Sequence, residues 1–384
     1  MRLKAGHVWV YRSDIRVEGE IPPGALVAVH SERGRPIGSA LYSSASQIAL
    51  RMVSSQVLPD ESALLELLRE RIRQAITYRK RVVAPDAEAH RLIFSEADGL
   101  PGLIVDRYRQ ILSLQPLTQA MDRAEIKQAV LAELVQQLSA CGMTSVVERV
   151  EPHIRELEQL PPAASRLLHG DETSTIYSIN RIRLHYEALG GQKTGAFLDQ
   201  RENYAAAARY AAGEALDAFC YQGGFALHLA AKCSKVTALD SSRPALEVAE
   251  RNEQLNPGRP EIEWIEGNAF DFLKDSAATG KHYDTIVLDP PAFAKSKRTL
   301  QTALRGYKEL NLRGLKMLRP GGVLVTCSCS YHLSTPDFLQ MLTSAAADAR
   351  RCVKVLEMRS QALDHPVVLG IPETHYLKCA IVTG

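Results

Sequence analysis

From about residue 186 onward, short apolar runs alternate with longer stretches of helical periodicity, and this alternation constrains the fold more than any other feature. A helix is expected from Phe225 and another from Ser242 to about Asn256. The strands expected around them are 215–220, 235–240, 262–266, 285–289 and 323–327. Because parallel strands need crossover connections, usually helices, the pattern predicts an α/β fold with a doubly wound, mostly parallel sheet.

The first half of the chain has a different pattern. Turn-forming residues separate three short apolar runs, which predict a small all-β unit: 25–30, 36–41 and 47–53. Helical periodicity then begins near Asp60, and a loop is expected after Pro161-Pro162. Between them we expect a helix at 124–140 and strands at 103–106, 110–117 and 145–148. At 384 residues the chain is long enough for several domains, which we place at 1–70, 71–185 and 186–384.

Charge and hydropathy exclude some classes of protein. The chain has 46 Lys and Arg against 44 Asp and Glu, so its net charge of +2 does not by itself require a nucleic-acid partner. No window is apolar enough for a membrane span, and the N-terminus lacks the features of a signal peptide, so we expect a cytoplasmic protein. Five basic residues of the helix after Asp60 are expected on a solvated face: Arg69, Arg71, Arg73, Arg79 and Lys80.

The seven cysteines indicate neither a disulfide framework nor a zinc site, because their number is odd and no Cys-x-x-Cys pair is present. Five of them are expected to be buried as small apolar residues: Cys141, Cys220, Cys233, Cys352 and Cys379. The other two, Cys327 and Cys329, end an expected strand in the sequence Val-Thr-Cys-Ser-Cys-Ser, where a thiol could act as a nucleophile.

Four segments at strand ends predict a ligand site, because open α/β sheets bind ligands at the carboxyl edge of their strands. The first is a turn with Gly223 and Gly224, which lets the backbone approach a ligand but lacks the dinucleotide pattern. The second ends in Asp240, an acid suited to ribose hydroxyls. The third and fourth are 266–273 and 288–293. Asp240 as a simple helix cap and Asn268 as a simple turn residue are the structural alternatives.

This series of segments resembles class I S-adenosylmethionine-dependent methyltransferases, and the resemblance implies that cofactor. By the same resemblance, the Gly223 turn meets the methionine moiety and Asp240 the ribose. Asn268 and Ala269 then meet the adenine. Further residues placed at the cofactor are Asp199, Tyr221, Ser241 and Asp289.

Asp289-Pro290-Pro291 and Cys329 together predict a specific chemistry. Two prolines stiffen the backbone after the strand and remove two amide donors, so that the carbonyls can accept from a base. Carbon 5 of cytosine becomes nucleophilic when a thiolate adds to carbon 6 and an acid stabilises charge at ring nitrogen 3. A cysteine and an aspartate facing one pocket therefore predict methylation of cytosine carbon 5.

Longer motifs over nearly the whole chain resemble the bacterial 23S ribosomal RNA cytosine-5 methyltransferase family. They are Lys193–Asn203, Leu288–Ser296, Arg305–Asn311, Thr326–Ser330 and Asp364–Lys378. Gly6–Ile15 and Tyr42–Arg51 resemble the PUA domain of that family, and Arg91–Tyr108 its central domain. The resemblance implies a small all-β PUA barrel, a central α+β domain and a Rossmann-like class I methyltransferase domain.

The family resemblance also implies roles for single residues and a partner. Cys329 would be the nucleophile and Asp289 the acid that binds cytosine. The stretch before the cofactor turn would line the pocket through Lys193, Thr194, Asp199 and Arg201. The implied partner is 23S ribosomal RNA, unassembled or partly assembled and held in part by the PUA domain. Whether the chain forms a homodimer is left open.

Two departures from the family pattern leave alternatives. Cys327 adds a second thiol, which faces the same side as Cys329 on a strand, and we interpret it as a packing residue. The run from Lys295 to Arg298 also resembles relatives that methylate guanine, although those lack the cysteine of Ser-Cys-Ser. The alternative functions are therefore guanine N-methylation of ribosomal RNA and a non-catalytic RNA-binding role in ribosome assembly.

Overall fold

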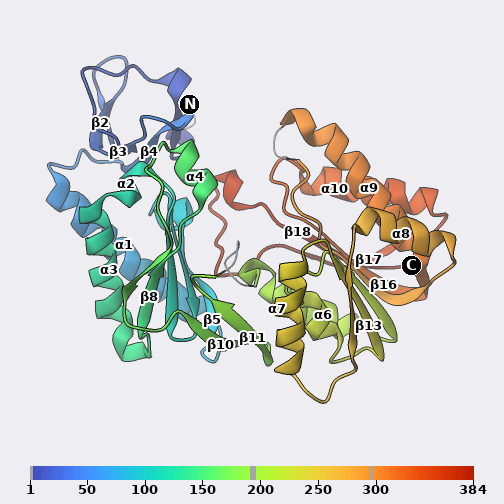
Figure 1. The fold of residues 1–384 in the computed structure, drawn as a ribbon. Helices are drawn as coiled ribbons and strands as arrows, with labels where there is room; N and C mark the ends of the chain where they lie inside the picture. The colour runs from blue at the N-terminus through green and yellow to red at the C-terminus, as the bar shows by residue number, and fades with distance from the viewer. Residues whose placement is uncertain (1–2, 191–195, 295–296) are drawn as a thin grey trace. The chain divides into compact units, whose positions relative to one another are not determined.

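The structure is a computed structural model that describes residues 3–190, 196–294 and 297–384, and the chain divides into two compact units (Figure 1). Unit 1 comprises residues 1–177, 186–194 and 363–374, and unit 2 comprises residues 178–185, 195–362 and 375–384. Most residues of the two domains expected at 1–70 and 71–185 lie together in unit 1. The three-domain division with boundaries at 70 and 185 stays a prediction.

Unit 2 is built on a seven-stranded sheet with the strand order β14-β13-β12-β15-β16-β18-β17. The strands are β12 (Glu214–Ala218), β13 (Lys235–Asp240), β14 (Ile262–Glu266), β15 (Tyr283–Leu288), β16 (Leu318–Ser328), β17 (Lys354–Arg359) and β18 (Lys378–Thr383). The first five pair in parallel, and β18 pairs antiparallel with both its neighbours. The predicted doubly wound, mostly parallel sheet is confirmed.

Helices cover both faces of this sheet. Figure 1 shows α6 and α7 on one face and α8, α9 and α10 on the other. The helices of unit 2 are α5 (Arg201–Tyr210), α6 (Gly224–Leu229), α7 (Arg243–Gln254), α8 (Ala269–Ala278), α9 (Leu300–Met317) and α10 (Thr335–Asp348). The core lies between the sheet and α8 to α10, where Leu288, Leu310, Leu324 and Phe338 are fully buried. This packing fixes the carboxyl ends of β12, β13, β15 and β16 at one edge.

Unit 1 begins with a four-stranded antiparallel sheet in the order β1-β4-β3-β2. The strands are β1 (Trp9–Tyr11), β2 (Leu26–His30), β3 (Pro36–Tyr42) and β4 (Ile48–Ser54). The last three coincide with the three predicted runs to within a residue or two, so the small all-β unit is confirmed. Helix α1 (Glu61–Val82) follows, and its N-cap Asp60 accepts a hydrogen bond from the amide of Ala63.

A second sheet of unit 1 has the order β5-β6-β7-β8-β9. Its strands are β5 (Ala89–Phe94), β6 (Leu103–Tyr108), β7 (Ile111–Pro116), β8 (Ser145–Glu148) and β9 (Arg166–His169). Helices α1 and α3 (Ala124–Leu138) pack against it, with the short α2 (Gln119–Asp122) and α4 (Pro152–Leu157) beside them. The loop predicted after Pro161-Pro162 is present, but β9 and the hairpin of β10 (Ser174–Ile179) and β11 (Ile182–Glu187) follow it and were not predicted.

The prediction of a solvated basic face on α1 was wrong for two of the five residues. Arg79 is 2% exposed, and its guanidinium lies 2.5 Å from the carboxylate of Asp98 and donates to the carbonyls of Arg91 and Asp364. Arg71 donates to backbone carbonyls on either side of the helix. Long guanidinium side chains thus satisfy buried carbonyls where α1 packs against its neighbours. No helix in the described ranges is long and apolar enough to cross a bilayer.

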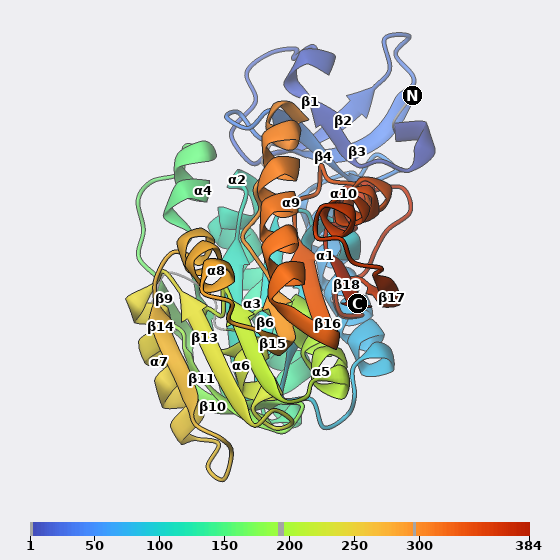
Figure 2. The ribbon, with the colours of Figure 1, turned by 90° about the vertical axis from the view of Figure 1, so that its right-hand side faces the viewer.

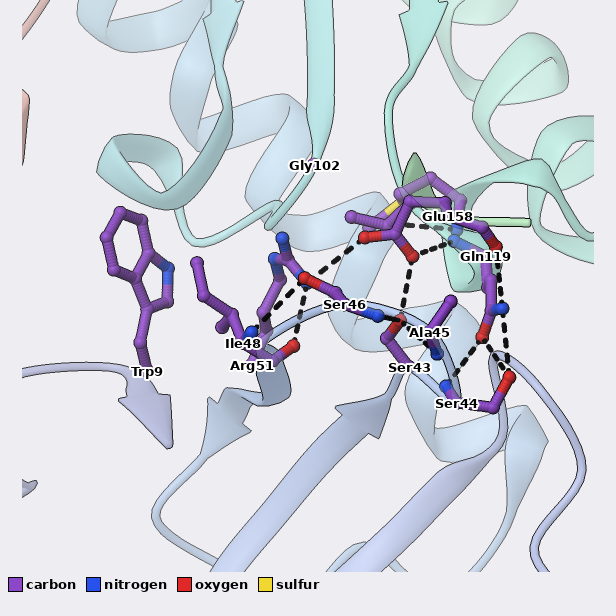
Figure 3. A network of polar contacts seen from close by, with 12 residues as sticks. Trp9, Ser43, Ser44, Ala45, Ser46, Ile48, Arg51, Gly102, Gln119 and Glu158 are labelled. Carbon is purple, nitrogen blue, oxygen red and sulfur yellow. Dashed lines mark hydrogen bonds and ion pairs between the residues drawn. The ribbon is translucent and has the colours of Figure 1, made fainter. Parts of the chain in front are cut away.

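A buried polar network attaches the N-terminal sheet to the rest of unit 1 (Figure 3). The carboxylate of Glu158, just after α4, accepts hydrogen bonds from the Ser43 hydroxyl at 2.8 Å and the Gln119 amide at 3.3 Å. The Gln119 side chain also accepts from the amide of Ser44 at 2.9 Å. Arg51 of β4 lies 3.8 Å from Glu158 and adds an ion pair. The turn between β3 and β4 is therefore held by side chains from α2 and the end of α4.

Candidate active site

The turn between β12 and α6 has an unusual backbone. Phe219 and Tyr221 have positive φ angles of 71° and 49°, which residues other than glycine seldom adopt. Gly223 has φ 85° and caps α6, and a Cβ there would lie 2.8 Å from the ring of Trp264. Glycine at 223 is thus required by both its backbone angle and the approach of β14. The Tyr221 ring lies 5.2 Å from that of Phe197, centroid to centroid.

Asp240, the last residue of β13, holds this turn in place. One carboxylate oxygen accepts from the amide of Tyr221 at 2.9 Å, and the other accepts from the amide of Ser242 at 2.9 Å. Each carboxylate oxygen has a second lone pair, so Asp240 keeps acceptor capacity toward a ligand hydroxyl. Ser242 caps α7, whereas Ser241 is exposed in the turn.

Asp217 is a buried acid of β12 that the sequence reasoning missed. Its Oδ2 accepts from the amide of Ala226 in α6 at 2.8 Å. Its Oδ1 is buried without a hydrogen-bond partner in the part of the chain that the structure describes. Burial, and then the charge of Asp289, raise the pKa of Asp217 well above its usual value. An acid beside a glycine turn was the signal that could have identified it.

Asn268 caps α8, which is the structural alternative considered from the sequence. Its Oδ1 accepts from the amides of Phe270 at 2.8 Å and Asp271 at 3.4 Å. The side chain is exposed, and the following Ala269 is buried. The cap accounts for the residue type at this position, and the predicted contact with adenine stays a prediction.

Asp289 lies directly after β15 and receives a hydrogen bond from a buried amide. The Gln200 side chain donates to Oδ2 of Asp289 at 3.0 Å and accepts from Asn203 of α5 at 2.6 Å. Burial, and then the charge of Asp199, raise the pKa of Asp289 to about 7, and the bond from Gln200 opposes this shift. Asp199 accepts from the Tyr376 hydroxyl at 2.7 Å. These contacts bring together the segments before α5, after β15 and before β18.

The other residues predicted to line the pocket before the cofactor turn are Arg201, Lys193 and Thr194, and only Arg201 lies among the described residues. Arg201 begins α5 and is buried, and its guanidinium lies 3.6 Å from the carboxylate of Glu202. Lys193 and Thr194 lie outside the described residues, as do Lys295 and Ser296. Gln200 was not predicted, because nothing in a single glutamine marks its long-range contact with Asp289.

The two cysteines at the end of β16 differ in accessibility. Cys327 is fully buried and pairs in register with the buried Cys379 of β18. Cys329 follows the last strand residue, Ser328, and is partly exposed. Burial, and then the charges of Asp289 and Asp199, raise the pKa of Cys329 to about 11, whereas the charge of Lys378 lowers it. Of the two thiols, only that of Cys329 is partly exposed to solvent, and the charges of the two acids act on it.

Ser330 fixes the turn that carries Cys329. Its hydroxyl accepts from the amide of Ala294 at 3.1 Å and shares a hydrogen bond of 2.9 Å with the hydroxyl of Tyr307 in α9. Its carbonyl accepts from the ammonium of Lys378 in β18 at 2.7 Å. The Asp-Pro-Pro segment and the Ser-Cys-Ser turn are thus joined directly.

A cavity with a volume of about 310 Å³ adjoins this turn. Two imidazoles, a phenol and an ammonium group give it a mixed aromatic and basic lining. The lining residues are Tyr331, His332, Leu333, Ser334, Thr335, His375 and Lys378. The rings of Tyr331 and His332 lie 5.2 Å apart, centroid to centroid.

The other cysteines partly contradict the prediction that all five are buried. Cys220, Cys233 and Cys379 are buried, but Cys141 and Cys352 are exposed. Cys141 is the last residue of a short 3-10 helix, Ser139–Cys141, and Cys352 lies in the connection between α10 and β17. All seven cysteines are free.

Comparison with known proteins shows which family has this sheet order. Residues 106–371 match the model of the S-adenosylmethionine-dependent methyltransferase family, and residues 1–55 match that of the PUA-like domain. A candidate S-adenosylmethionine-dependent methyltransferase from Streptococcus mutans has the same fold, with a TM-score of 0.82 at 18% identity over 100% of this chain and 97% of that one. A candidate methyltransferase solved with SAH superposes equally well. The fold and the site thus define an S-adenosylmethionine-dependent methyltransferase.

Relatives of higher identity narrow the class. Ribosomal RNA large subunit methyltransferase I of Serratia proteamaculans is 36% identical over 97% of this chain and 94% of its own length. The protein of the same name from Photobacterium profundum is 36% identical over 98% and 95%. The chain belongs to the ribosomal RNA large subunit methyltransferase I family. The resemblance stated from the sequence motifs is confirmed at this level.

The residues at the strand ends fit the cofactor of the family. S-adenosylmethionine carries an ammonium group and two ribose hydroxyls, all hydrogen-bond donors. The unpartnered Oδ1 of Asp217 and the spare lone pairs of Asp240 are acceptors that can meet such donors. A site rich in carboxyl groups also suits a ligand with a positively charged sulfonium.

Proposed function

We propose that this protein methylates carbon 5 of a cytosine in 23S ribosomal RNA, with Cys329 as the covalent nucleophile and Asp289 as the acid at ring nitrogen 3. The names of its relatives support large-subunit ribosomal RNA as the substrate class. The observation that carries the proposal is the parallel pairing of β15 with β16, in which Leu288 lies opposite Thr326, so that Asp289 and Cys329 both follow the ends of neighbouring strands. The charge of Asp289 accordingly raises the pKa of the Cys329 thiol. Guanine N-methylation needs no such thiol.

The two groups have properties that suit these roles. With a pKa of about 7, Asp289 is about half protonated at neutral pH and largely protonated below it, so its protonated form can donate a hydrogen bond to ring nitrogen 3. Gln200 holds Oδ2 and thereby orients the carboxyl group. Cys329 is partly exposed, so the cytosine ring of a substrate can reach its sulfur. Cys327 is fully buried, so its sulfur is inaccessible to a substrate.

The covalent steps balance around these residues. The Cys329 thiol loses its proton and the thiolate bonds to carbon 6, and the displaced ring electrons make carbon 5 nucleophilic while Asp289 stabilises nitrogen 3. When bound, S-adenosylmethionine would supply the activated methyl group to carbon 5, and the bond between its sulfur and that methyl group would break to leave the neutral thioether S-adenosylhomocysteine. A base then takes the carbon 5 proton, and the bond between sulfur and carbon 6 breaks to restore the aromatic ring and the thiolate.

We further propose that the cofactor lies at the carboxyl ends of β12, β13 and β14. The turn at Tyr221 and Gly223 would meet its methionine moiety, and Asp240 with Ser241 its ribose. Asn268 and Ala269 would meet its adenine. Asp199 and Asp289 would bound the cofactor on the side of Cys329. The cavity beside that thiol would admit the target nucleotide, and the PUA-like sheet would bind RNA elsewhere on the chain.

Substitution of the two cysteines tests this function. Cys329→Ala should abolish methyl transfer to 23S ribosomal RNA while S-adenosylmethionine binding, measured by calorimetry, is retained. Cys327→Ala is the matched control and should keep most activity, because this thiol is fully buried and out of reach of a nucleobase. Mass spectrometry of nucleosides identifies the product. Methylguanosine, or 5-methylcytidine formed by the Cys329→Ala protein, would reject the proposal.

A further inference from the structure

Lys378 is a buried lysine at the base of the turn that carries Cys329. It begins β18, is 3% exposed, and pairs in register with Ser328 at the end of β16. Its ammonium donates to the carbonyl of Ser330 at 2.7 Å and to the carbonyl of Tyr376 at 2.7 Å. Lysine is seldom buried unless its charge has a use, because desolvation of an ammonium is unfavourable.

Both of these hydrogen bonds go to neutral carbonyl groups rather than to a carboxylate. Burial consequently lowers the pKa of Lys378 to about 8, and the Cys329 thiol opposes that shift. An ammonium has three donors, so one N–H remains beyond the two carbonyl bonds. Lys378 is also one of the residues that line the cavity next to the turn.

The titratable groups around Cys329 come from several elements of unit 2. Asp289 after β15 and Asp199 before α5 both disfavour the thiolate, and Lys378 on β18 favours it. Tyr307 on α9 also faces the thiol, since the Cys329 charge adds to burial in raising the pKa of Tyr307. His332 and His375 line the cavity with Lys378. Negative charge on the two acids disfavours ionisation of the Cys329 thiol, and the positive charge of Lys378 offsets part of that effect.

We propose that Lys378 is a positioning residue for the nucleophile: its ammonium group holds the turn that carries Cys329 and supplies positive charge beside the thiolate. The proposal rests on the proposed function in that it takes Cys329 as the nucleophile. The hydrogen bond to the carbonyl of Ser330 fixes where the sulfur lies. The charge increases the fraction of the sulfur that is ionised.

Alkylation of Cys329 by iodoacetamide tests this role in the full chain without RNA or cofactor. Only the thiolate reacts, so the rate as a function of pH reports its ionisation. Peptide mass spectrometry measures the modification of Cys329 separately from that of the other six thiols. The variants are Lys378→Gln, which keeps a donor without the charge, and Lys378→Arg, which keeps the charge. Lys316→Met removes an exposed lysine of α9 as a control.

A charge that stabilises the thiolate predicts that Lys378→Gln slows alkylation of Cys329 by about tenfold or more at neutral pH, where Lys378, with a pKa of about 8, is still charged. Lys378→Arg should restore most of the rate at neutral pH, and Lys316→Met should leave that rate unchanged. Equal profiles for Lys378→Gln and the unchanged protein would overturn the proposal. If the Gln chain does not fold, as judged by thermal unfolding, Lys378→Met serves in its place.

The same variants separate this proposal from the proposed function. In methyl transfer, Lys378→Gln should lower kcat by about tenfold or more with KM for S-adenosylmethionine unchanged, and Lys378→Arg should recover most of kcat. If RNA treated with the unchanged protein contains no 5-methylcytidine, the proposed function is rejected. The alkylation profiles would still decide the role of Lys378. A normal product with unaltered alkylation would reject only the role of Lys378.

Discussion

At the scale of single residues, Asp289 has a charge state that folding changes. Its pKa rises from a usual value of 3.8 to about 7 in the folded chain, so the native state holds a proton that the unfolded state releases in this range. Stability from this residue is therefore fully present below about pH 4 and is lost as the pH rises through about 7.

Asp289→Asn removes this dependence. Relative to the unchanged protein, the free energy of unfolding of the variant should increase as the pH rises from about 4 to about 7 and then level off. Urea unfolding at several pH values measures the difference. Acids whose pKa Asp289 does not influence contribute equally to both proteins, whereas Asp217 loses the part of its upward pKa shift that comes from the charge of Asp289. A difference that is flat over this range would show that Asp289 is not protonated in the folded chain.

Residues that the sequence allowed us to predict share one property: each follows a strand. Asp240, Asp289 and Cys329 could be placed from strand ends because parallel strands end at the same edge of a sheet. Gln200 and Lys378 could not, because their importance depends on contacts with residues distant in the chain.

At the scale of elements, the Tyr307 hydroxyl of α9 is hydrogen-bonded to Ser330 in the turn that carries Cys329. Tyr307→Phe removes the hydrogen bond to Ser330 but keeps the ring, so we expect a loss of about 1 kcal/mol in the free energy of unfolding together with slower methyl transfer. Tyr210→Phe is a matched control, since it removes the bond to Glu357 from the end of α5. Activity that is lowered equally by both substitutions would contradict a specific role for the bond.

Elements with strong periodicity could be predicted, and those defined by pairing could not. β14 and β8 have the predicted bounds, and α1 begins at Glu61, next to the predicted start near Asp60. β9 has only four residues, with no buried position among them, so its apolar pattern is weak. The left-handed residues Phe219 and Tyr221 were also unforeseen, because their conformation depends on the acid of β13 rather than on their own side chains.

At the scale of the whole molecule, the N-terminal sheet depends on the network around Glu158. Glu158→Ala leaves the buried Ser43 hydroxyl and the Gln119 amide without their acceptor, so we expect a loss of about 2–4 kcal/mol in the free energy of unfolding of unit 1. Hydrogen exchange in β3 and β4 should become faster. Glu156→Ala changes an exposed residue of the preceding helix α4 and should change stability by less than about 0.5 kcal/mol. Unchanged exchange in Glu158→Ala would show that the network is dispensable.

Figure 2 shows the N-terminal strands β1 to β4 and, in the other unit, the strands β13 to β18 of the methyltransferase sheet. The family and its cofactor could be predicted from motifs spread along the chain, because these motifs fall at strand ends and turns that the fold itself requires. The division of the chain into compact units could not, since residues 186–190 and 363–374 belong with the N-terminal half.

The central claim is that the sulfur of Cys329 bonds to a cytosine of 23S ribosomal RNA, and a trapped complex tests it most directly. In RNA transcribed with 5-fluorocytidine, carbon 5 carries fluorine in place of the proton, so the enzyme cannot be released after methyl transfer. Incubation with S-adenosylmethionine should give a protein–RNA complex that survives denaturation, with a methylated nucleotide on Cys329 by peptide mass spectrometry. A chain that methylates unmodified RNA yet forms no such complex, or is attached through another residue, would contradict the account.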